Sequence, residues 1–265
     1  MAERRPIATV GEVGVDPLGG ARAILEGDLI WSMYEPFIDL KSGKVVGYEA
    51  LARFVRPDGV AVSPGSLFAL LHTDPQLLFA VELAVKRHQL ANAPPGAELF
   101  VNLDPDSWAA AGEGADNPLL DLLEAAPMPL VVEVIENLDV GDALVSRGMV
   151  AAARARGLRI ALDDVGAANS LLSFEALDEA EVLKFDRTLL RALARPRRRA
   201  VIQALARMAR ETGARTILEG VESAADLKLA AELGVDQVQG WFFEELAIRS
   251  SKPALVGLEP VGPRP

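Results

Sequence analysis

LRIALDD (158–164) is a short apolar run that ends on two adjacent acidic residues. Comparable runs rich in Val, Ile and Leu recur along the chain, and longer stretches with a helical apolar period separate them. Short apolar runs are typical of buried strands, and their regular alternation with helices is typical of a parallel barrel. The expected strands are 99–103, 130–135, 158–164, 182–186, 216–220 and 235–240, and the expected helices are 76–92, 139–156, 188–211 and 223–233.

Glycine and proline mark the ends of these elements. Gly157, Gly213 and Gly234 each follow an expected helix and precede an expected strand, which is the C-cap position of an α-to-β loop. Pro196 falls inside the helical stretch 188–211. Because proline disrupts a helix interior but fits a first turn, it predicts a break or a new helix start there.

The opening section, IWSMYEPFIDLKSGKVVGYEALARF (30–54), consists of two strand-like runs joined by a turn. Adjacent strands joined by a tight turn are antiparallel. The predicted fold is therefore α/β, a TIM-like (β/α)8 barrel with an antiparallel first strand. We expect a flexible N-terminal arm over 1–23, one barrel domain over 24–250, and a Pro-rich disordered tail over 251–265.

Composition narrows the chemistry. Lys and Arg number 27 against 38 Asp and Glu, and the resulting net charge of −11 argues against non-specific binding to DNA or membrane surfaces. The sequence contains no run of 18 apolar residues, so no membrane-spanning helix is expected. The absence of Cys excludes thiolate ligands and fits a soluble cytoplasmic protein. With only His72 and His88 as imidazoles, a metal site must be mostly oxygen-based, which favours Mg²⁺, Mn²⁺ or Ca²⁺.

Several expected strands end on a polar residue that a packed core would not contain. These residues are Glu49, Asn102, Glu133 with Glu136, Asp163 with Asp164, Lys184, Glu219 with Glu222, and Gln239. In a barrel the C-terminal strand ends face one mouth, so these side chains are expected to converge. Gathered carboxylates repel unless cations neutralise them. Two divalent metals would do so and would activate water for attack on a phosphodiester.

Each of these positions also has a structural interpretation. A lone acid at a strand end is commonly a helix cap or a surface charge, and for Glu222 the two readings are balanced because it precedes an expected helix. Two adjacent acids such as Asp163 and Asp164 favour function. Lys184, inside an apolar strand, needs an acidic partner on either interpretation.

Glu49-Ala50-Leu51 followed by Arg53 resembles the motif of the EAL domains, the bacterial cyclic-di-GMP-specific phosphodiesterases. The resemblance runs from about residue 24 to about residue 250, through YEPFIDLKSGKVVGYEALAR, VNLD, EVIE, LDDVGAANSLL, LKFD, EGVE and QGWFF in the family's order. It implies hydrolysis of one phosphodiester of cyclic-di-GMP to give linear pGpG. It also implies Mg²⁺ or Mn²⁺, as two ions, and a role in bacterial second-messenger signalling.

The resemblance assigns roles to individual residues. The implied metal ligands are Glu49, Asn102, Glu133, Asp163, Asp164 and Glu219. The implied catalytic residues are Glu219 as general base or further ligand, Lys184 as the group that orients water or stabilises charge, and Glu49. Arg53 would clamp a substrate phosphate, with Gln239 beside the second metal, and Glu136 and Glu222 would anchor the neighbouring loops.

Some positions depart from the family pattern. Ile135 stands where Thr is usual between the paired acids, and Ala168 replaces a Gly in the loop after the Asp pair. Val165 replaces an aromatic residue, and Asp104 replaces a Ser. None of these changes removes an implied ligand, so an active enzyme is favoured. The alternatives are a weak or inactive EAL domain that acts as a cyclic-di-GMP receptor, or a protein-interaction module. The resemblance further suggests a homodimer, and the altered loop suggests a regulatory protein partner.

Overall fold

The computed structural model describes residues 17–112, 116–135, 140–167, 173–192, 195–251 and 253. Eight strands close into a barrel in the order β1-β9-β8-β7-β6-β5-β4-β2, and β2 returns to β1. The barrel strands are β1 (Ile30–Asp39), β2 (Val45–Val55), β4 (Glu98–Asn102), β5 (Leu130–Ile135), β6 (Arg159–Val165), β7 (Val182–Phe185), β8 (Arg215–Leu218) and β9 (Gln237–Val238). Two short strands, β3 (Ala61–Val62) and β10 (Ile248–Arg249), extend the sheet beyond it.

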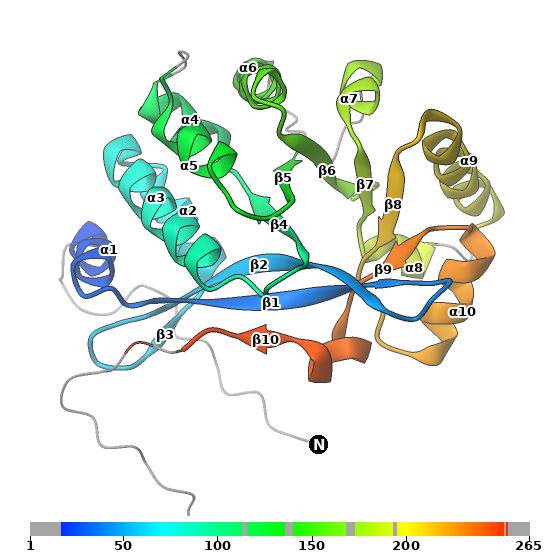
Figure 1. Cartoon of the computed structure of the whole chain (residues 1–265), viewed down its shortest axis with the longest axis horizontal. Helices are drawn as coiled ribbons and strands as arrows, with labels where there is room; N and C mark the ends of the chain where they lie inside the picture. Colours follow the sequence, from blue (N-terminus) through cyan, green and yellow to red (C-terminus); the bar gives the residue numbers. More distant parts are fainter. Residues whose placement is uncertain are drawn as a thin grey trace, which may run out of the picture.

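Helices lie on the outside of this barrel (Figure 1). They are α1 (Pro17–Glu26), α2 (Pro64–Leu71), α3 (Pro75–Ala91), α4 (Pro105–Ala111), α5 (Pro118–Glu124), α6 (Val140–Ala155), α7 (Phe174–Glu179), α8 (Thr188–Ala192), α9 (Pro196–Thr212) and α10 (Ala224–Leu233), with a 3₁₀ helix η1 (Trp241–Leu246). Among the described residues, no helix is both long and apolar enough to cross a membrane.

The helix ends follow from local chemistry. Helices α2 to α5 each begin at a proline. Hydrogen bonds from the free backbone N–H groups of their first turns are accepted by the side chains of Ser63, Asp74, Asp104 and Asn117. The departure from the family at Asp104 is thus a helix cap. As predicted, Gly213 and Gly234 end α9 and α10 with φ of 83° and 78°, and α9 begins at Pro196.

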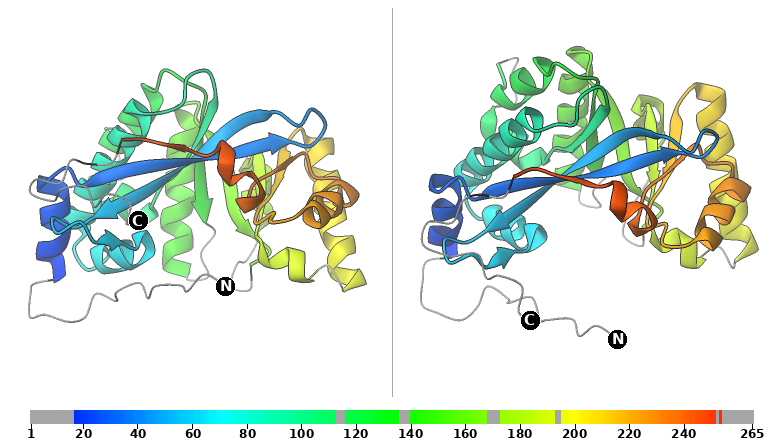
Figure 2. Two further views of the ribbon diagram at one scale, coloured as in Figure 1. Left: turned by 90° about the horizontal axis from the view of Figure 1, so that it is seen from below. Right: turned by 60° about the horizontal axis from the view of Figure 1, so that its bottom comes forward.

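The hairpin of β1 and β2 closes the barrel, and both strands are longer than the barrel strands that they contact. The C-terminal part of β1 pairs with β9 and its N-terminal part with β10, all antiparallel. Strand β2 pairs in parallel with β4 at one end and antiparallel with β3 at the other. Figure 2 shows β10 lying alongside β1, outside the barrel. The α/β barrel with an antiparallel first strand is therefore confirmed.

Side chains fill the barrel interior. A buried layer from six strands packs at its centre: Phe37, Phe100, Val131, Ala161, Val182 and Ile217. The rings of Phe37 and Phe100 meet edge to face with centroids 4.5 Å apart. Beneath this layer, Glu98 accepts two hydrogen bonds from Arg215, at 2.8 and 3.1 Å, and pairs with Arg159 at 2.5 Å. Because the interior is packed, a site must lie at a strand end.

The short helices α2, α4, α5 and α7 were not among the helices predicted from the sequence. The arm expected over 1–23 is corrected in part, because α1 occupies it from Pro17 onward. Its hydrophobic side chains explain the difference, since Ala21 and Ile24 are buried in one core cluster with β1 and α3. Residues 1–16, and residues 252 and 254–265 of the expected tail, lie outside the described residues.

Candidate active site

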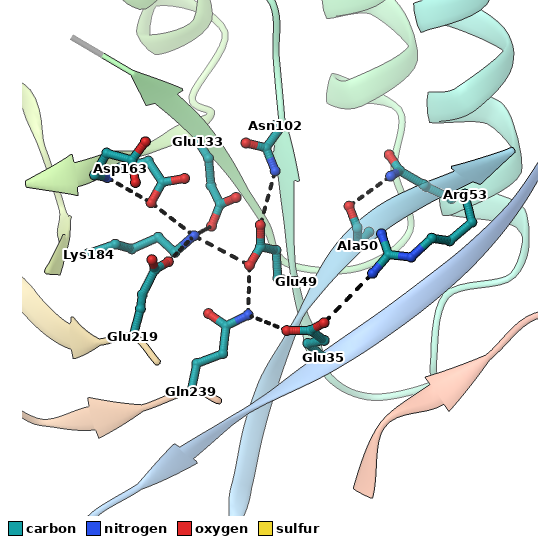
Figure 3. A network of polar contacts seen from close by, with 12 residues as sticks. Glu35, Glu49, Ala50, Arg53, Asn102, Glu133, Asp163, Lys184, Glu219 and Gln239 are labelled. Carbon is teal, nitrogen blue, oxygen red and sulfur yellow. Dashed lines mark hydrogen bonds and ion pairs between the residues drawn. The ribbon is translucent and has the colours of Figure 1, made fainter. Parts of the chain in front are cut away.

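Adjacent strands bring the expected polar residues to one end of the barrel (Figure 3). Asn102 ends β4 and pairs in register with Glu133 on β5. Asp163 lies near the end of β6, Lys184 lies on β7, and Glu219 directly follows β8. Glu49 of β2 faces the same point. Parallel strands in staggered register thus gather side chains that are far apart in sequence, as the strand-end argument predicted.

Lys184 is the centre of this group. Its Nζ lies 2.6 Å from Glu133 Oε1, 2.9 Å from Glu219 Oε1, 3.1 Å from Asp163 Oδ1 and 3.5 Å from Glu49 Oε2. The Lys184 side chain is fully buried. Burial opposes its charge, but the surrounding carboxylates raise its pKa well above the ordinary value. The lysine therefore remains a fixed positive charge within an acidic cluster.

Glu49 is held by amide groups. Asn102 Nδ2 donates to its Oε1 at 3.1 Å, and Gln239 Nε2 donates to its Oε2 at 2.7 Å. Burial disfavours the carboxylate, but Lys184 and the Gln239 amide together hold the pKa of Glu49 below its usual value. Glu49 is consequently an ionised carboxylate with a fixed orientation, which suits a ligand.

Other carboxyl groups of the cluster are short of positive charge. Burial, reinforced by Glu49, raises the pKa of Glu133 well above its ordinary value. Burial also raises the pKa of Glu219 to about 8. Burial and the neighbouring Asp163 raise the pKa of Asp164. One lysine thus does not neutralise the acids that the barrel gathers here.

The donor set fits divalent metal. Among the described residues no donor is found for Glu133 Oε2, and Oε1 faces only the Lys184 ammonium, 2.6 Å away. Buried polar atoms without partners are unfavourable, and a hard cation would satisfy such carboxylates. Two groups of carboxylates lie close enough to share an ion, Glu49–Glu133–Asp163 and Asp163–Asp164–Glu219. Asp163 belongs to both.

The turn after β6 sets the position of the aspartate pair. Pairing between β6 and β7 shifts register between Leu162 and Val165. Within this irregularity Asp164 adopts φ of 55°, and its N–H donates to Asp163 Oδ1 at 2.9 Å. Gly166 follows with φ of 90°. This left-handed conformation is uncommon for a residue other than Gly. It bends the chain so that Asp163 and Asp164 both face the site.

A pocket opens over the acidic cluster. Its lining residues are Glu35, Glu49, Asp163, Asp164, Asp186, Arg187, Glu219, Gly220, Gln239, Gly240 and Trp241. Trp241 is 70% exposed at the edge. A side chain at Gly220 would place its Cβ 2.2 Å from Arg187 Cβ, so only glycine allows this approach. The site residues predicted from the sequence did not include Glu35, Asp186, Arg187 or Trp241.

Glu35 had a readable signal in the sequence. It is a charged residue inside the first predicted strand, and the hairpin register places it directly opposite Glu49. Gln239 Nε2 lies 3.4 Å from Glu35 Oε2 and thereby bridges the two acids. Arg53, the expected phosphate clamp, lies beyond Glu35, with Nη2 3.8 Å from Glu35 Oε1, and is outside the pocket lining.

One residue that was expected at the site lies apart from the cluster, and others lie outside the described residues. The Glu222 side chain is exposed, and its backbone N–H donates to Asp226. Glu136, Ala168 and the side chain of Ile135 lie outside the described residues, so the expected loop-anchoring roles and the effects of these departures stay predictions.

A third group of potential ligands lies away from the pocket. His72 Nε2 lies 3.0 Å from Asp104 and 3.5 Å from Asp106. His72 follows α2 and also contacts the Phe68 carbonyl through Nδ1, whereas Asp104 caps α4. Contacts at the helix ends therefore account for this group.

Residues 21–245 match the model of the EAL domain family. Cyclic di-GMP phosphodiesterase RocR of Pseudomonas aeruginosa is 27% identical over 218 residues, which cover 79% of this chain and 55% of RocR. The Bacillus subtilis YkuI protein, solved with cyclic-di-GMP and calcium, superimposes with a TM-score of 0.71 at 26% identity over 91% of this chain and 59% of YkuI. Klebsiella pneumoniae BlrP1, solved with manganese and cyclic-di-GMP, superimposes with a TM-score of 0.69 at 25% identity, over 85% of this chain and 57% of BlrP1.

The chain belongs to the EAL domain family, because the family model spans most of its length. It covers 33%, 29% and 42% of three of the curated relatives that it matches, so those proteins contain further regions.

Proposed function

We propose that this chain hydrolyses one phosphodiester bond of cyclic-di-GMP to give linear pGpG, using two divalent ions, Mg²⁺ or Mn²⁺. The observation that carries the proposal is the pair of carboxylate groups that share Asp163 at the barrel mouth. Paired sites of this kind are typical of phosphodiester hydrolysis. The substrates named for RocR and for the solved relatives supply the nucleotide.

The first ion would be held by Glu49, Asn102, Glu133 and Asp163, and the second by Asp163, Asp164 and Glu219. Bound metal would lower the pKa of a water molecule and stabilise charge on the phosphoryl oxygens. Asn102 Nδ2 and Gln239 Nε2 orient Glu49 from opposite sides.

Lys184 and Glu219 are the groups that we assign to proton and charge control. Lys184 Nζ is fixed 2.9 Å from Glu219 Oε1, so it can stabilise negative charge on the attacking oxygen. Glu219 directly follows β8 at the same cluster, so once it is ionised its carboxylate could accept a proton from a water molecule held there. Arg53 would bind a substrate phosphate at the far side of Glu35.

An enzyme is favoured over a receptor that has lost activity. Every implied ligand side chain is present at the cluster in the described part of the chain. The proposed homodimer, the regulatory partner and a cytoplasmic location rest on the family resemblance and composition.

The test is product analysis by chromatography after incubation with cyclic-di-GMP and Mg²⁺ or Mn²⁺. Wild type should release pGpG, and EDTA or Glu49→Gln should abolish release. Glu49→Gln keeps the side-chain volume, so its failure reports the ligand rather than packing. Binding without pGpG at any metal concentration would contradict the enzyme assignment.

A further inference from the structure

Glu35 lies in the pocket but in neither group of carboxylates that could share an ion. It occupies β1 directly opposite Glu49 of β2. Like charges opposite each other across strands destabilise a sheet unless other groups compensate them. The compensating groups at Glu35 are Gln239 and Arg53. Glu35 is therefore a surplus negative charge between the proposed metal ligands and the proposed phosphate clamp.

The contact between Arg53 and Glu35 is loose. Arg53 Nη2 lies 3.8 Å from Glu35 Oε1, which is too long for a hydrogen bond. Arg53 Nη1 instead donates to the Ala52 carbonyl at 3.0 Å. Figure 3 shows the guanidinium facing Glu35 on the side away from Lys184. Arg53 and Glu35 therefore interact through the attraction of opposite charges and not through a hydrogen bond.

Gln239 holds Glu35 from the other side. Its Nε2 donates to Glu49 Oε2 at 2.7 Å and lies 3.4 Å from Glu35 Oε2. The Glu35 side chain is 23% exposed and that of Arg53 is 27% exposed, so both are partly open to solvent, with Glu35 in the pocket lining and Arg53 next to it outside the lining. A phosphate that approaches Arg53 from the pocket side would therefore meet the Glu35 carboxylate, which is negatively charged as well.

We propose that Glu35 sets substrate affinity by competing with a substrate phosphate for Arg53, an inference that rests on the proposed phosphodiesterase function. Guanidinium binds phosphate through paired hydrogen bonds, which the contact with Glu35 does not supply. Substrate phosphate therefore displaces Glu35 from Arg53, and the negative charges of the phosphate and of Glu35 repel each other. Glu35 is a specificity-determining residue and touches no reacting atom.

The test is Glu35→Gln, which removes the charge and keeps the shape. An exposed ion pair of this kind corresponds to about a fivefold effect on affinity. The KM for cyclic-di-GMP should fall about fivefold while kcat and the Mn²⁺ affinity stay unchanged. Glu26→Gln, the same charge change at an exposed position on α1, should leave KM unchanged. An unchanged or raised KM in Glu35→Gln would overturn the inference.

A double-mutant cycle separates competition for Arg53 from a general charge effect. In an Arg53→Ala background, Glu35→Gln should change KM by less than about twofold. A full fivefold effect retained without Arg53 would refute competition, because it would show repulsion of substrate by Glu35 alone.

The generic phosphodiester bis(4-nitrophenyl) phosphate distinguishes failure of this inference from failure of the proposed function. If the chain cleaves this ester with the same dependence on Glu35 and Arg53 but does not cleave cyclic-di-GMP, the nucleotide assignment fails and the role of Glu35 stands. If the chain cleaves cyclic-di-GMP with no Glu35 dependence, only the inference fails. If it cleaves neither ester, both fail.

Discussion

Glu133 Oε1 lies 2.6 Å from Lys184 Nζ, and both side chains are fully buried. A buried pair of this kind is weak evidence for stability, because removing both charges from water costs nearly as much as their attraction returns. Here the lysine also faces three further carboxylates. The arrangement is consistent with a metal-binding cluster in which Lys184 limits the repulsion between carboxylates when metal is absent.

Lys184→Met should destabilise the metal-free protein, because it removes the buried positive charge from a set of carboxylates. The expected loss in free energy of unfolding is about 3 kcal/mol. Saturating Mn²⁺ should restore part of it, since metal binds the native cluster only. Urea unfolding in EDTA and in Mn²⁺ measures both values. Equal stability of the variant and wild type in EDTA would show that Lys184 does not compensate the acids.

Metal binding should release protons near neutral pH. Burial raises the pKa of Glu219 to about 8 in the metal-free protein and raises that of Glu133 well above its ordinary value. Both groups therefore carry protons below these pKa values, and metal ligands must be ionised. Apparent Mn²⁺ affinity should rise with pH up to about 8 and weaken as pH falls. Calorimetry in buffers of different ionisation enthalpy counts the protons, and zero release would contradict the assignment.

Asp163 is the carboxylate common to both candidate metal groups. Asp163→Asn should therefore weaken both ions, whereas Glu133→Gln and Glu219→Gln should each weaken one. Wild type should bind two Mn²⁺ per chain, by calorimetry or equilibrium dialysis. Retention of two ions by Asp163→Asn, with normal affinity, would show that the two groups do not share this residue.

Glu98 should contribute to stability and not to the site. It joins β4 to β6 and β8 through Arg159 and Arg215 beneath the apolar layer of the barrel. Because the arginines are partly exposed, Glu98→Ala should lower the free energy of unfolding by about 1–2 kcal/mol. Mn²⁺ affinity should not change. Thermal unfolding checks the first outcome, and a loss of metal binding in a fully folded variant would contradict the second.

Much of the fold could be predicted because its signals are local. Apolar runs, the break at Pro196 and the glycine stops at Gly213 and Gly234 depend on backbone chemistry within a few residues. The tight turn likewise required an antiparallel first strand. The helix α1 was missed because its stability comes from packing of Ala21 and Ile24 against distant elements.

The site shows the same division. The alternation of apolar strands with helices can be recognised along the chain, and it shows which polar residues lie at strand ends. Glu49, Glu133 and Asp163 could therefore be predicted. Glu35 was missed because its proximity to Glu49 depends on the register across the hairpin. The left-handed turn at Asp164 arises from a register shift between β6 and β7, which is a property of the assembled barrel.

Anomalous diffraction from crystals grown with Mn²⁺ and cyclic-di-GMP tests the metal assignment most directly. Two manganese peaks should appear at the barrel mouth, one beside Glu49 and Glu133 and one beside Asp164 and Glu219, with Asp163 contacting both. Nucleotide phosphate should lie against the ions. Nucleotide bound at the mouth with no manganese peak among these carboxylates would contradict metal-dependent hydrolysis at this site.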